Sequence, residues 1–311
     1  MGEHNSCLIV GAGIAGLSAA AVLRDVGWQV QLLDKGRSLG GRMATRRVGS
    51  SRFDHGAQFF TVRDARFRAA VEQWQASAWV APWFTDDGHT RYRGTQGMNG
   101  LAKGLAVDLD IRTETTVTKI LPDPEGWRIY ADGEHEFCAS TVIVTCPVPQ
   151  SLALLGDRAP SVLTGLAYDP CFALMAVLDG PSLVPSPGYV RPNPGPISFL
   201  ADNTQKGISE GPGALTIHAT PEFSRHWFDG DREEIAQVLL DAARPWLGAQ
   251  VVSTQLHRWK FSQPVNPYPD SCFIVHAPSP LAFAGDAFSG PRVEGAWLSG
   301  LAAAMALISA A

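Results

Sequence analysis

A glycine-rich turn near the amino terminus constrains the fold of this sequence more than any other feature. Residues 11–16 read GAGIAG and stand between an apolar run at 6–10 and a helix-forming segment at 14–26. A second apolar run, residues 29–33, ends at Asp34. Short apolar runs bounded by turn residues are typical of buried strands. The pattern therefore predicts a strand, a tight turn, a helix and a second strand with an acid at its end.

Each glycine of this turn meets a steric demand of dinucleotide binding. Gly11 allows the tight turn, Gly13 lets the backbone approach a pyrophosphate, and Gly16 lets the helix pack closely on the sheet. The pyrophosphate would lie at the helix start, where N–H groups are unpaired and the helix dipole is positive. Asp34 can accept hydrogen bonds from ribose hydroxyls. The whole unit predicts a dinucleotide site, for NAD or FAD alike.

The residues after Asp34 distinguish between these two dinucleotides. They read KGRSLGGR at 35–42. Gly40 and Gly41 permit another close backbone approach, and the guanidinium of Arg42 can bind phosphate oxygens with two hydrogen bonds. A simple NAD-dependent dehydrogenase needs no such second phosphate contact. Taken alone, however, Arg42 would be interpreted as a surface cation.

Composition excludes several classes of function. The chain has 311 residues, more than one hydrophobic core usually supports, so two lobes are expected. Its net charge of -5 gives no electrostatic reason to expect a nucleic-acid partner. Five scattered cysteines without a CxxC pair favour a reduced cytoplasmic protein without a metal site. The apolar segment 296–311 is too short to span a bilayer and is expected to be a buried terminal helix, so no membrane partner is expected.

Four later segments, together with the amino-terminal unit, carry a family resemblance. The order GxGxxG, acid, basic residue and GGR resembles the flavin-containing amine oxidase superfamily. Residues 54–59 (DHGAQF) resemble the segment that runs alongside the flavin, and 142–147 (VIVTCP) resemble an apolar strand that ends in a small-residue turn. Residues 281–286 (LAFAGD) resemble the strand whose aspartate holds the ribityl chain. Residues 292–296 (RVEGA) resemble the start of a terminal helix that faces the isoalloxazine ring.

This resemblance implies FAD as the cofactor. The binding is expected to be non-covalent, because no cysteine lies near the late flavin motif. A helix amino terminus would stabilise negative charge on reduced flavin. A glutamate there need not face the ring, since a first-turn acid also favours the helix dipole. The resemblance assigns to the cofactor site Gly11, Gly13, Ile14, Ala15, Gly16, Asp34, Lys35, Gly41, Arg42, Gly56, Ala57, Gln58, Phe59, Val117, Thr145, Gly285, Asp286, Arg292, Val293, Glu294 and Ala296.

Within the superfamily the sequence resembles the renalases, especially their bacterial forms. The matching segments are residues 56–64, 217–220, 257–259 and 290–300, the last reading GPRVEGAWLSG. This resemblance implies an oxidase that takes hydride from 2- or 6-dihydro isomers of NAD(P)H and passes electrons to O2, giving NAD(P)+ and H2O2. The loop expected at 80–94 is shorter than in renalases and could border the substrate.

The expected fold is an α/β Rossmann-type FAD-binding domain with a discontinuous α+β substrate domain built on an antiparallel sheet, as in amine oxidases and p-hydroxybenzoate hydroxylase. We assign residues 1–60, 94–165 and 260–311 to the FAD domain, and residues 61–93 and 166–259 to the substrate domain. Helices are expected at 64–77, 98–107 and 231–247. Strands are expected at 111–120, 127–130, 171–178, 197–201, 214–219 and 251–260.

Five residues are candidates for the catalytic pocket. Gln58 and Phe60 lie in the segment expected to touch the ring. His218 alternates with Thr216 and Thr220 and could face a pocket, although a hydrogen-bonded sheet histidine explains the pattern as well. Trp259 could stack on flavin or substrate or simply pack. Arg258 could bind a substrate phosphate.

Three other functions remain open. A small-amine oxidase would need an aromatic cage and often an acid for the ammonium, and no cage is identifiable in the sequence. A carotenoid-desaturase-like enzyme would usually carry a membrane-binding surface. A non-catalytic FAD-binding scaffold is also compatible, because the motifs serve binding rather than turnover.

Overall fold

Both faces of the amino-terminal strand are buried, and this determines the layers of the first lobe. The structure is a computed structural model that describes residues 5–310. On β1 (Ser6–Val10), Cys7 and Ile9 point into one apolar core, whereas Leu8 and Val10 point into another. A strand buried on both faces is typical of a sheet covered by layers on each side. The predicted Rossmann-type lobe is confirmed.

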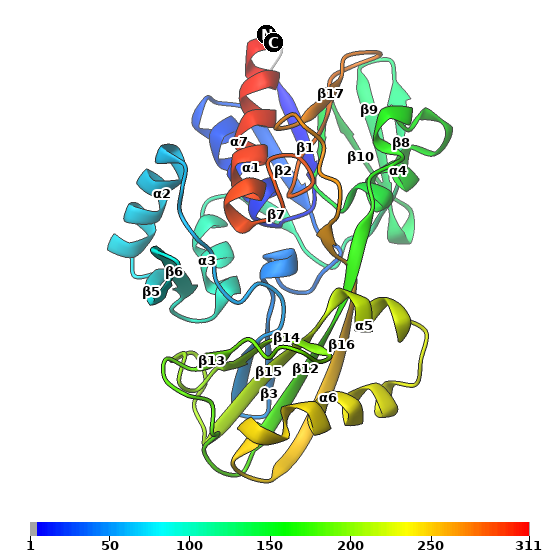
Figure 1. Ribbon diagram of the computed structural model, residues 1–311. Coiled ribbons are helices and arrows are strands. Elements are labelled where there is room, and N and C mark those ends of the chain that lie inside the picture. Colours follow the sequence, from blue (N-terminus) through cyan, green and yellow to red (C-terminus); the bar gives the residue numbers. More distant parts are fainter. Residues whose placement is uncertain (1–4, 311) are drawn as a thin grey trace.

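A six-stranded sheet forms the centre of this upper lobe in Figure 1. Its order is β17-β18-β11-β1-β2-β7, and all neighbouring pairs are parallel except β17 with β18. α1 (Ile14–Asp25) and α7 (Val293–Ala310) pack together on one face. The other face carries α4 (Val148–Leu155) and the sheet of β8 (Val117–Asp123), β9 (Gly126–Ala131) and β10 (His135–Ala139). The remaining strands of the central sheet are β2 (Gln29–Leu33), β7 (Asp110–Arg112), β11 (Thr141–Val144), β17 (Phe273–Val275) and β18 (Leu281–Phe283).

The strand predicted at 111–120 is two strands in two different sheets. β7 extends the parallel sheet, whereas β8 begins the antiparallel one. Between them Glu114 has a φ of +52°, a left-handed conformation that a continuous strand does not contain. Because apolar residues stand on both sides of the break, the sequence pattern resembles one continuous strand.

The lower lobe in Figure 1 is an antiparallel sheet with helices on one face, as predicted. β12 (Tyr168–Leu178) lies between β15 (Gly213–Ala219) and β16 (Val251–Pro264). β14 (Ile197–Asp202) and the short β13 (Tyr189–Val190) complete the order β13-β14-β15-β12-β16. α5 (Pro221–His226) and α6 (Arg232–Leu247) cover one face, and the other face meets the hairpin of β3 (Thr45–Val48) and β4 (Ser51–Asp54).

The segment predicted as 61–93 of the substrate domain contacts both lobes. α2 (Ala65–Ala76), capped by Asp64, buries Phe67, Val71 and Trp74 in the core of the upper lobe. The expected loop at 80–94 is instead a hairpin of β5 (Val80–Asp86) and β6 (His89–Gly94). α3 (Met98–Leu105) follows, two residues shorter than predicted. Residues 1–4 and 311 of the predicted FAD domain lie outside the described residues.

The last helix begins within the segment 292–296, where the sequence predicted the start of a terminal helix. α7 begins at Val293 and spans 18 residues, so by length and composition alone it could cross a membrane. Half of its residues are buried inside the protein, however. A Cβ at Gly300 would lie 2.1 Å from the Ala15 carbonyl oxygen, so α7 lies in close contact with α1. This contact is typical of the core helix of a globular domain.

Candidate functional site: the nucleotide turn and a cationic cavity between the lobes

The three glycines of the amino-terminal turn have three different environments. Gly11 has a φ of +105°, and a Cβ there would lie 2.6 Å from Thr145 Oγ1. A Cβ at Gly16 would lie 2.0 Å from the Gly11 carbonyl oxygen. A Cβ at Gly13 would have no protein atom within 4 Å. A Cβ therefore does not fit at Gly11 or Gly16, as their predicted steric roles require, and Gly13 borders open space.

The start of α1 fits a phosphate group. Gly13 is its N-cap residue and offers no side chain to the first N–H groups of the helix. Ile14 and Ala15, both predicted to contact the cofactor, open this helix. The open space beside Gly13 and the free helix start together match what a dinucleotide pyrophosphate requires.

Asp34 directly follows β2 and also stabilises the glycine-rich turn through hydrogen bonds. Its Oδ2 accepts a hydrogen bond from Ala12 N at 2.7 Å, and its Oδ1 accepts one from Gly36 N at 2.6 Å. Each carboxylate oxygen has a second lone pair that can accept a ribose hydroxyl. Thr145 fastens β11 to the same turn, because its Oγ1 donates to the carbonyl oxygens of Val10 and Gly11 at 3.0 Å. Lys35, by contrast, is exposed.

Arg42 and Asp286, both predicted to contact the cofactor, bind each other. The two terminal nitrogens of Arg42 donate to the two carboxylate oxygens of Asp286 at 2.6 and 2.7 Å. Arg42 also donates to the carbonyl oxygen of Ser262 at 3.3 Å. The sequence predicted that Arg42 makes a bidentate contact with phosphate oxygens. In the structure Arg42 makes its bidentate contact with the Asp286 carboxylate. The pair joins the residues after β2 to those after β18, two segments 244 positions apart.

The segment predicted to run alongside the flavin packs directly on Arg42. Ala57 N donates to the Arg42 carbonyl oxygen at 2.8 Å. A Cβ at Gly56 would lie 1.9 Å from that same oxygen, so no larger residue fits there. The side chain of Gln58 is buried and folds back to donate to the Asp54 carbonyl oxygen. Residues 54–58 therefore form a rigid strip between the lobes.

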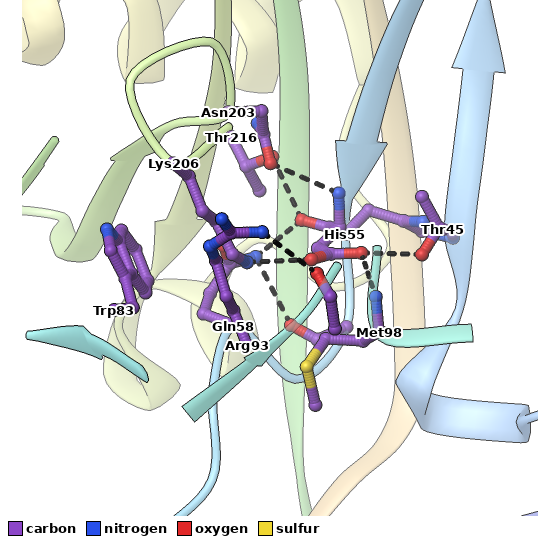
Figure 2. Close-up of polar contacts among 12 residues, drawn as sticks. Thr45, His55, Gln58, Trp83, Arg93, Met98, Asn203, Lys206 and Thr216 are labelled. Carbon is purple, nitrogen blue, oxygen red and sulfur yellow. Dashed lines mark hydrogen bonds and ion pairs between the residues drawn. The ribbon is translucent and has the colours of Figure 1, made fainter. Parts of the chain in front are cut away.

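A fully buried ion pair anchors this strip to the lower lobe (Figure 2). Lys206 Nζ lies 2.7 Å from Asp54 Oδ2, and both side chains are 0% exposed. Asp54 Oδ1 accepts hydrogen bonds from Thr45 Oγ1 and from Met98 N. Burial lowers the pKa of Lys206, and Asp54 opposes that shift. The hydrogen bonds to Asp54 supply the compensation that a buried ion pair needs.

A cavity of about 260 Å³ opens beside Lys206. Lys206 Nζ lies 3.5 Å from Gln58 Oε1 and 4.8 Å from the centre of the Trp83 ring. Figure 2 shows Trp83 and Arg93 next to Lys206. Among the residues that the structure describes, those that line this cavity include two cations and no carboxylate: Pro82, Trp83, Arg93, Ser186, Pro187, Gln205, Lys206 and Gly207.

Three histidines and Trp259 gather on the other side of the strip. The His55 carbonyl oxygen accepts a hydrogen bond from Trp259 Nε1 at 2.8 Å and lies 3.2 Å from His218 Nε2. The His55 ring stacks on Trp259, with 5.3 Å between centroids, and meets His257 edge-on. His218 Nε2 therefore carries the proton, because a carbonyl oxygen can only accept.

The environment of these histidines keeps them neutral at neutral pH. Burial lowers the pKa of His55 to about 3, with a further contribution from His257. Burial also lowers the pKa of His218 and of His257 to about 4. The sequence left His218 open between a pocket residue and a sheet histidine. Its contact with the backbone of the strip makes it a positioning residue.

None of the five predicted pocket residues lines the cavity, and two of them, Phe60 and Arg258, contact other parts of the protein. Phe60 is 3% exposed and packs among Phe67, Trp74 and Tyr92 in the core of the upper lobe. Arg258 points to the helix-covered face of β16, where it donates to the Phe228 carbonyl oxygen at 2.6 Å. Successive residues of a strand point to opposite faces, so Arg258 and Trp259 cannot line the same pocket.

Glu294 faces α2 rather than a ring site. Its side chain is 3% exposed, and Oε1 accepts hydrogen bonds from Arg63 N at 2.7 Å and Asp64 N at 2.8 Å. Of its neighbours in the motif, Ala296 is buried and Arg292 is exposed. The carboxylate of Glu294 therefore joins the start of α7 to the start of α2. The sequence offered a dipole role as the alternative, and the structure adds this cross-link.

The other predicted cofactor residues lie at strand and helix ends of the upper lobe. Val117 begins β8 and is buried, and Gly285 follows β18 with a φ of +139°. Gly41 has a φ of +53° beside Gly13, and Val293 opens α7. These positions surround the carboxyl ends of the parallel strands, where α/β sheets bind their ligands.

Sequence reasoning missed Trp83, Arg93 and Lys206. Lys206 follows a tight turn in which Asp202 Oδ1 accepts from Thr204 N at 2.8 Å, a pattern that predicts an exposed loop. Its burial depends on Asp54, 152 positions away. Arg93 lies in the polar run HTRYRG of β6, which is typical of an exposed hairpin. Nothing nearby in the chain predicts the surroundings of either cation.

An aromatic cluster borders the same cavity. Phe59, Trp83, Phe84, Tyr189 and Phe199 pack against one another, with the rings of Phe84 and Tyr189 only 4.0 Å apart. The guanidiniums of Arg91 and Arg191 lie over Phe59 and Phe199. The aromatic faces are therefore already in contact with the protein's own rings and cations.

The sequence matches two family models. The model described as an NAD(P)-binding Rossmann-like domain matches residues 9–74. The model described as flavin containing amine oxidoreductase matches residues 70–308, which is most of the chain. This family implies FAD, and the turn, Asp34 and the ends of the parallel strands fit that cofactor.

Curated relatives match over short segments. A carotenoid 3,4-desaturase from Haloarcula japonica is 46% identical over 56 residues, which cover 18% of this chain and 11% of the relative. A 1-hydroxycarotenoid 3,4-desaturase from Flavobacterium sp. is 42% identical over 55 residues, which cover 18% of this chain and 11% of that protein. The matches thus span a small part of these relatives' length and reach no further than a local likeness.

Solved structures match over the whole chain. A provisionally named protoporphyrinogen oxidase from Exiguobacterium sp. 255-15 has a TM-score of 0.75 at 16% identity, covering 99% of this chain and 98% of that one. A triple mutant of putrescine oxidase has a TM-score of 0.72 at 15% identity, covering 99% of each chain. At these identities the likeness establishes the fold.

Proposed function

Because the chain belongs to the flavin containing amine oxidoreductase family and is therefore an FAD-dependent oxidoreductase, we propose that it is an oxidase of 2- and 6-dihydro isomers of NAD(P)H. Bound FAD would supply the acceptor for the substrate's hydride and a route for its electrons to O2, so that the products are NAD(P)+ and H2O2. Such a substrate already carries a transferable hydride, and the reaction therefore requires no strong general base.

The cationic cavity is the observation that carries this proposal. It is lined by Arg93 and Lys206, and Lys206 Nζ lies 3.5 Å from Gln58 Oε1 in the strip between the lobes. The Asp54 carboxylate nearby is neutralised by Lys206. Positive charge in a partly desolvated cavity attracts an anionic dinucleotide and repels an alkylammonium. The charge of the site therefore favours a dihydronicotinamide dinucleotide over an amine.

The chain's own residues then have positioning roles. Gly56, Ala57 and Gln58 hold the strip against Arg42, which leaves a fixed wall on which a substrate ring can be oriented. The lowered pKa values of His55 and His218 keep both rings neutral, so they add no charge to the site at neutral pH. Trp259 donates a hydrogen bond to the His55 carbonyl oxygen and so holds the other side of the strip in place.

An anaerobic titration tests the proposal. The purified yellow protein is mixed without oxygen with the 2- or 6-dihydro isomer of NAD or NADP, and the flavin absorbance is followed. We expect rapid bleaching, then recovery with one equivalent of H2O2 when air is admitted. A flavin that dithionite reduces but neither isomer reduces would overturn the proposal. Putrescine and other small amines serve as the comparison, for which we expect no bleaching.

We also propose that FAD is held without a covalent bond. Support comes from the sequence, which has no cysteine in the late motif at 281–296. Heat or acid precipitation should release all of the flavin into the supernatant. Flavin that stays with the precipitated protein after washing in denaturant would contradict this.

A further inference from the structure

Arg93 differs from the other arginines around the cavity because it has no carboxylate partner. Arg91 and Arg191 both lie within 4 Å of Asp86, at 3.6 and 3.0 Å. Among the described residues no acid lies within that distance of Arg93, and its one protein hydrogen bond is a long one, 3.4 Å, to the Gly94 carbonyl oxygen. A guanidinium has five N–H donors. Most of those on Arg93 therefore remain available to a ligand in the cavity.

The surroundings hold the Arg93 guanidinium in place without using its donors. Gly207 has a φ of +77°, and a Cβ there would lie 3.3 Å from the terminal Nη2 of Arg93. Glycine at 207 thus leaves room for the guanidinium at the cavity wall. Trp83 forms another part of that wall, and its Nε1 donates to the Pro187 carbonyl oxygen at 2.8 Å. The cation is positioned by packing rather than by hydrogen bonds.

The cavity carries an unbalanced positive charge. Lys206 and Asp54 neutralise each other, which leaves Arg93 as the excess cation. Burial lowers the pKa of Arg93, and Asp54 opposes this shift from beyond ion-pair distance. A half-buried guanidinium without a counter-charge is costly unless a ligand supplies one. The missing counter-charge is an anion, and the flat geometry of a guanidinium suits the paired oxygens of a phosphate.

We propose that Arg93 is the specificity-determining residue of this site and binds a phosphate of the dinucleotide substrate with two hydrogen bonds. This inference rests on the proposed function, since it names the substrate group that the cavity recognises. Lys206 is held by Asp54 and serves as a fixed background charge. Trp83 provides a flat, rigid surface beside the bound phosphate.

The test compares a substrate with phosphates to one without. In the holoprotein, Arg93→Gln should raise the Kd of a 6-dihydro NAD isomer, measured from the rate of anaerobic flavin reduction, by about 10- to 100-fold. The limiting rate of reduction should not change. The same variant should leave the Kd of 6-dihydronicotinamide riboside, which has no phosphate, within about twofold. Equal effects on both substrates, or no effect on either, would overturn the proposal.

A matched variant and a second readout complete the design. Arg191→Gln removes a nearby cation that is already paired with Asp86, and it should leave both Kd values unchanged. Arg93→Lys keeps the charge but loses the paired geometry, and it should fall between wild type and Arg93→Gln. If neither isomer reduces the wild-type flavin, the proposed function fails, but inorganic pyrophosphate still tests the subsite. Pyrophosphate should perturb the wild-type flavin spectrum and not that of Arg93→Gln. Equal perturbation in both, or none in either, would overturn the subsite as well.

Discussion

The nucleotide turn and the cationic cavity are both candidate ligand sites, but they are built in opposite ways. The turn consists of backbone from one continuous segment, residues 11–16, closed by Asp34. The cavity is lined by three separate segments, represented by Arg93, Pro187 and Lys206. The turn therefore depends on local backbone conformation, and the spacing of the glycines predicts that conformation. The cavity depends on tertiary packing, which does not show in any short stretch of sequence.

This difference predicts where substitutions have their effects. In the turn, a substitution acts through steric conflict with the backbone, and the consequence appears first in cofactor binding. At the buried ion pair of Asp54 and Lys206 beside the cavity, a substitution acts through buried charge, and the consequence appears first in the stability of the fold. Four experiments test this contrast between the turn and the cavity.

The largest effect is expected at the buried ion pair. Asp54→Asn leaves Lys206 as an uncompensated buried cation and should lower the free energy of unfolding by about 3–5 kcal/mol, measured by urea denaturation. The double variant Asp54→Asn/Lys206→Met removes both charges and should recover much of that loss. If the single variant loses less than about 1 kcal/mol, the ion pair is not the main anchor of the strip.

The glycines of the turn should separate folding from cofactor binding. Gly16→Ala places a Cβ against the Gly11 carbonyl oxygen and should lower stability by about 1–3 kcal/mol as well as FAD content. Gly13→Ala extends into open space, so the apoprotein should keep its thermal midpoint while FAD affinity falls. Fluorescence titration of each apoprotein with FAD measures the second quantity. Equal loss of stability in both variants would contradict the assignment of Gly13.

The neutral histidines should make the protein sensitive to mild acid. The pKa of His218 falls from an ordinary value near 6.5 to about 4 on folding, so the unfolded chain binds protons first. Stability is then complete above pH 6.5 and falls as the pH drops toward 4, by about 1.4 kcal/mol per pH unit for each such histidine. His218→Gln should flatten this slope between pH 6.5 and 4. An unchanged slope would show that His218 does not titrate in this way.

The smallest effect is expected at Glu294. Glu294→Gln keeps an oxygen for the N–H groups of Arg63 and Asp64 but loses the charge, and should cost about 0.5–1.5 kcal/mol. Asp64→Asn is the control, because its carboxylate caps α2 from an exposed position. Thermal unfolding of both variants measures the difference. A larger loss at Asp64 than at Glu294 would reverse the proposed order.

The sequence predicted the fold well because local signals determined it. The strand, turn and helix at 6–26, the long strands of the lower lobe and the helix at 231–247 all follow from short-range patterns. The break at Glu114 and the hairpin at 80–94 were missed because apolar and turn residues gave ambiguous spacing. Arg258 was placed in the pocket because the register of β16, which sends it to the other face, depends on pairing with β12.

The candidate cofactor residues were predictable for the same reason, and the cavity was not. Gly11, Gly16 and Asp34 act within one short unit, whereas Lys206 becomes important only when the chain brings it to Asp54. Burial of a lysine is rare and needs a partner. A single sequence gives no means of finding that partner at a distance of 152 residues.

The contact between α1 and α7 can form only after almost the whole chain has been synthesised. Ser18 donates to the Trp297 carbonyl oxygen across 279 positions, and β18, which lies between β17 and β11, is also late in the chain. The apolar face of α1 is synthesised early, but it stays uncovered until α7 has also been synthesised. A nascent chain of this protein therefore exposes apolar surface of the kind that chaperones protect.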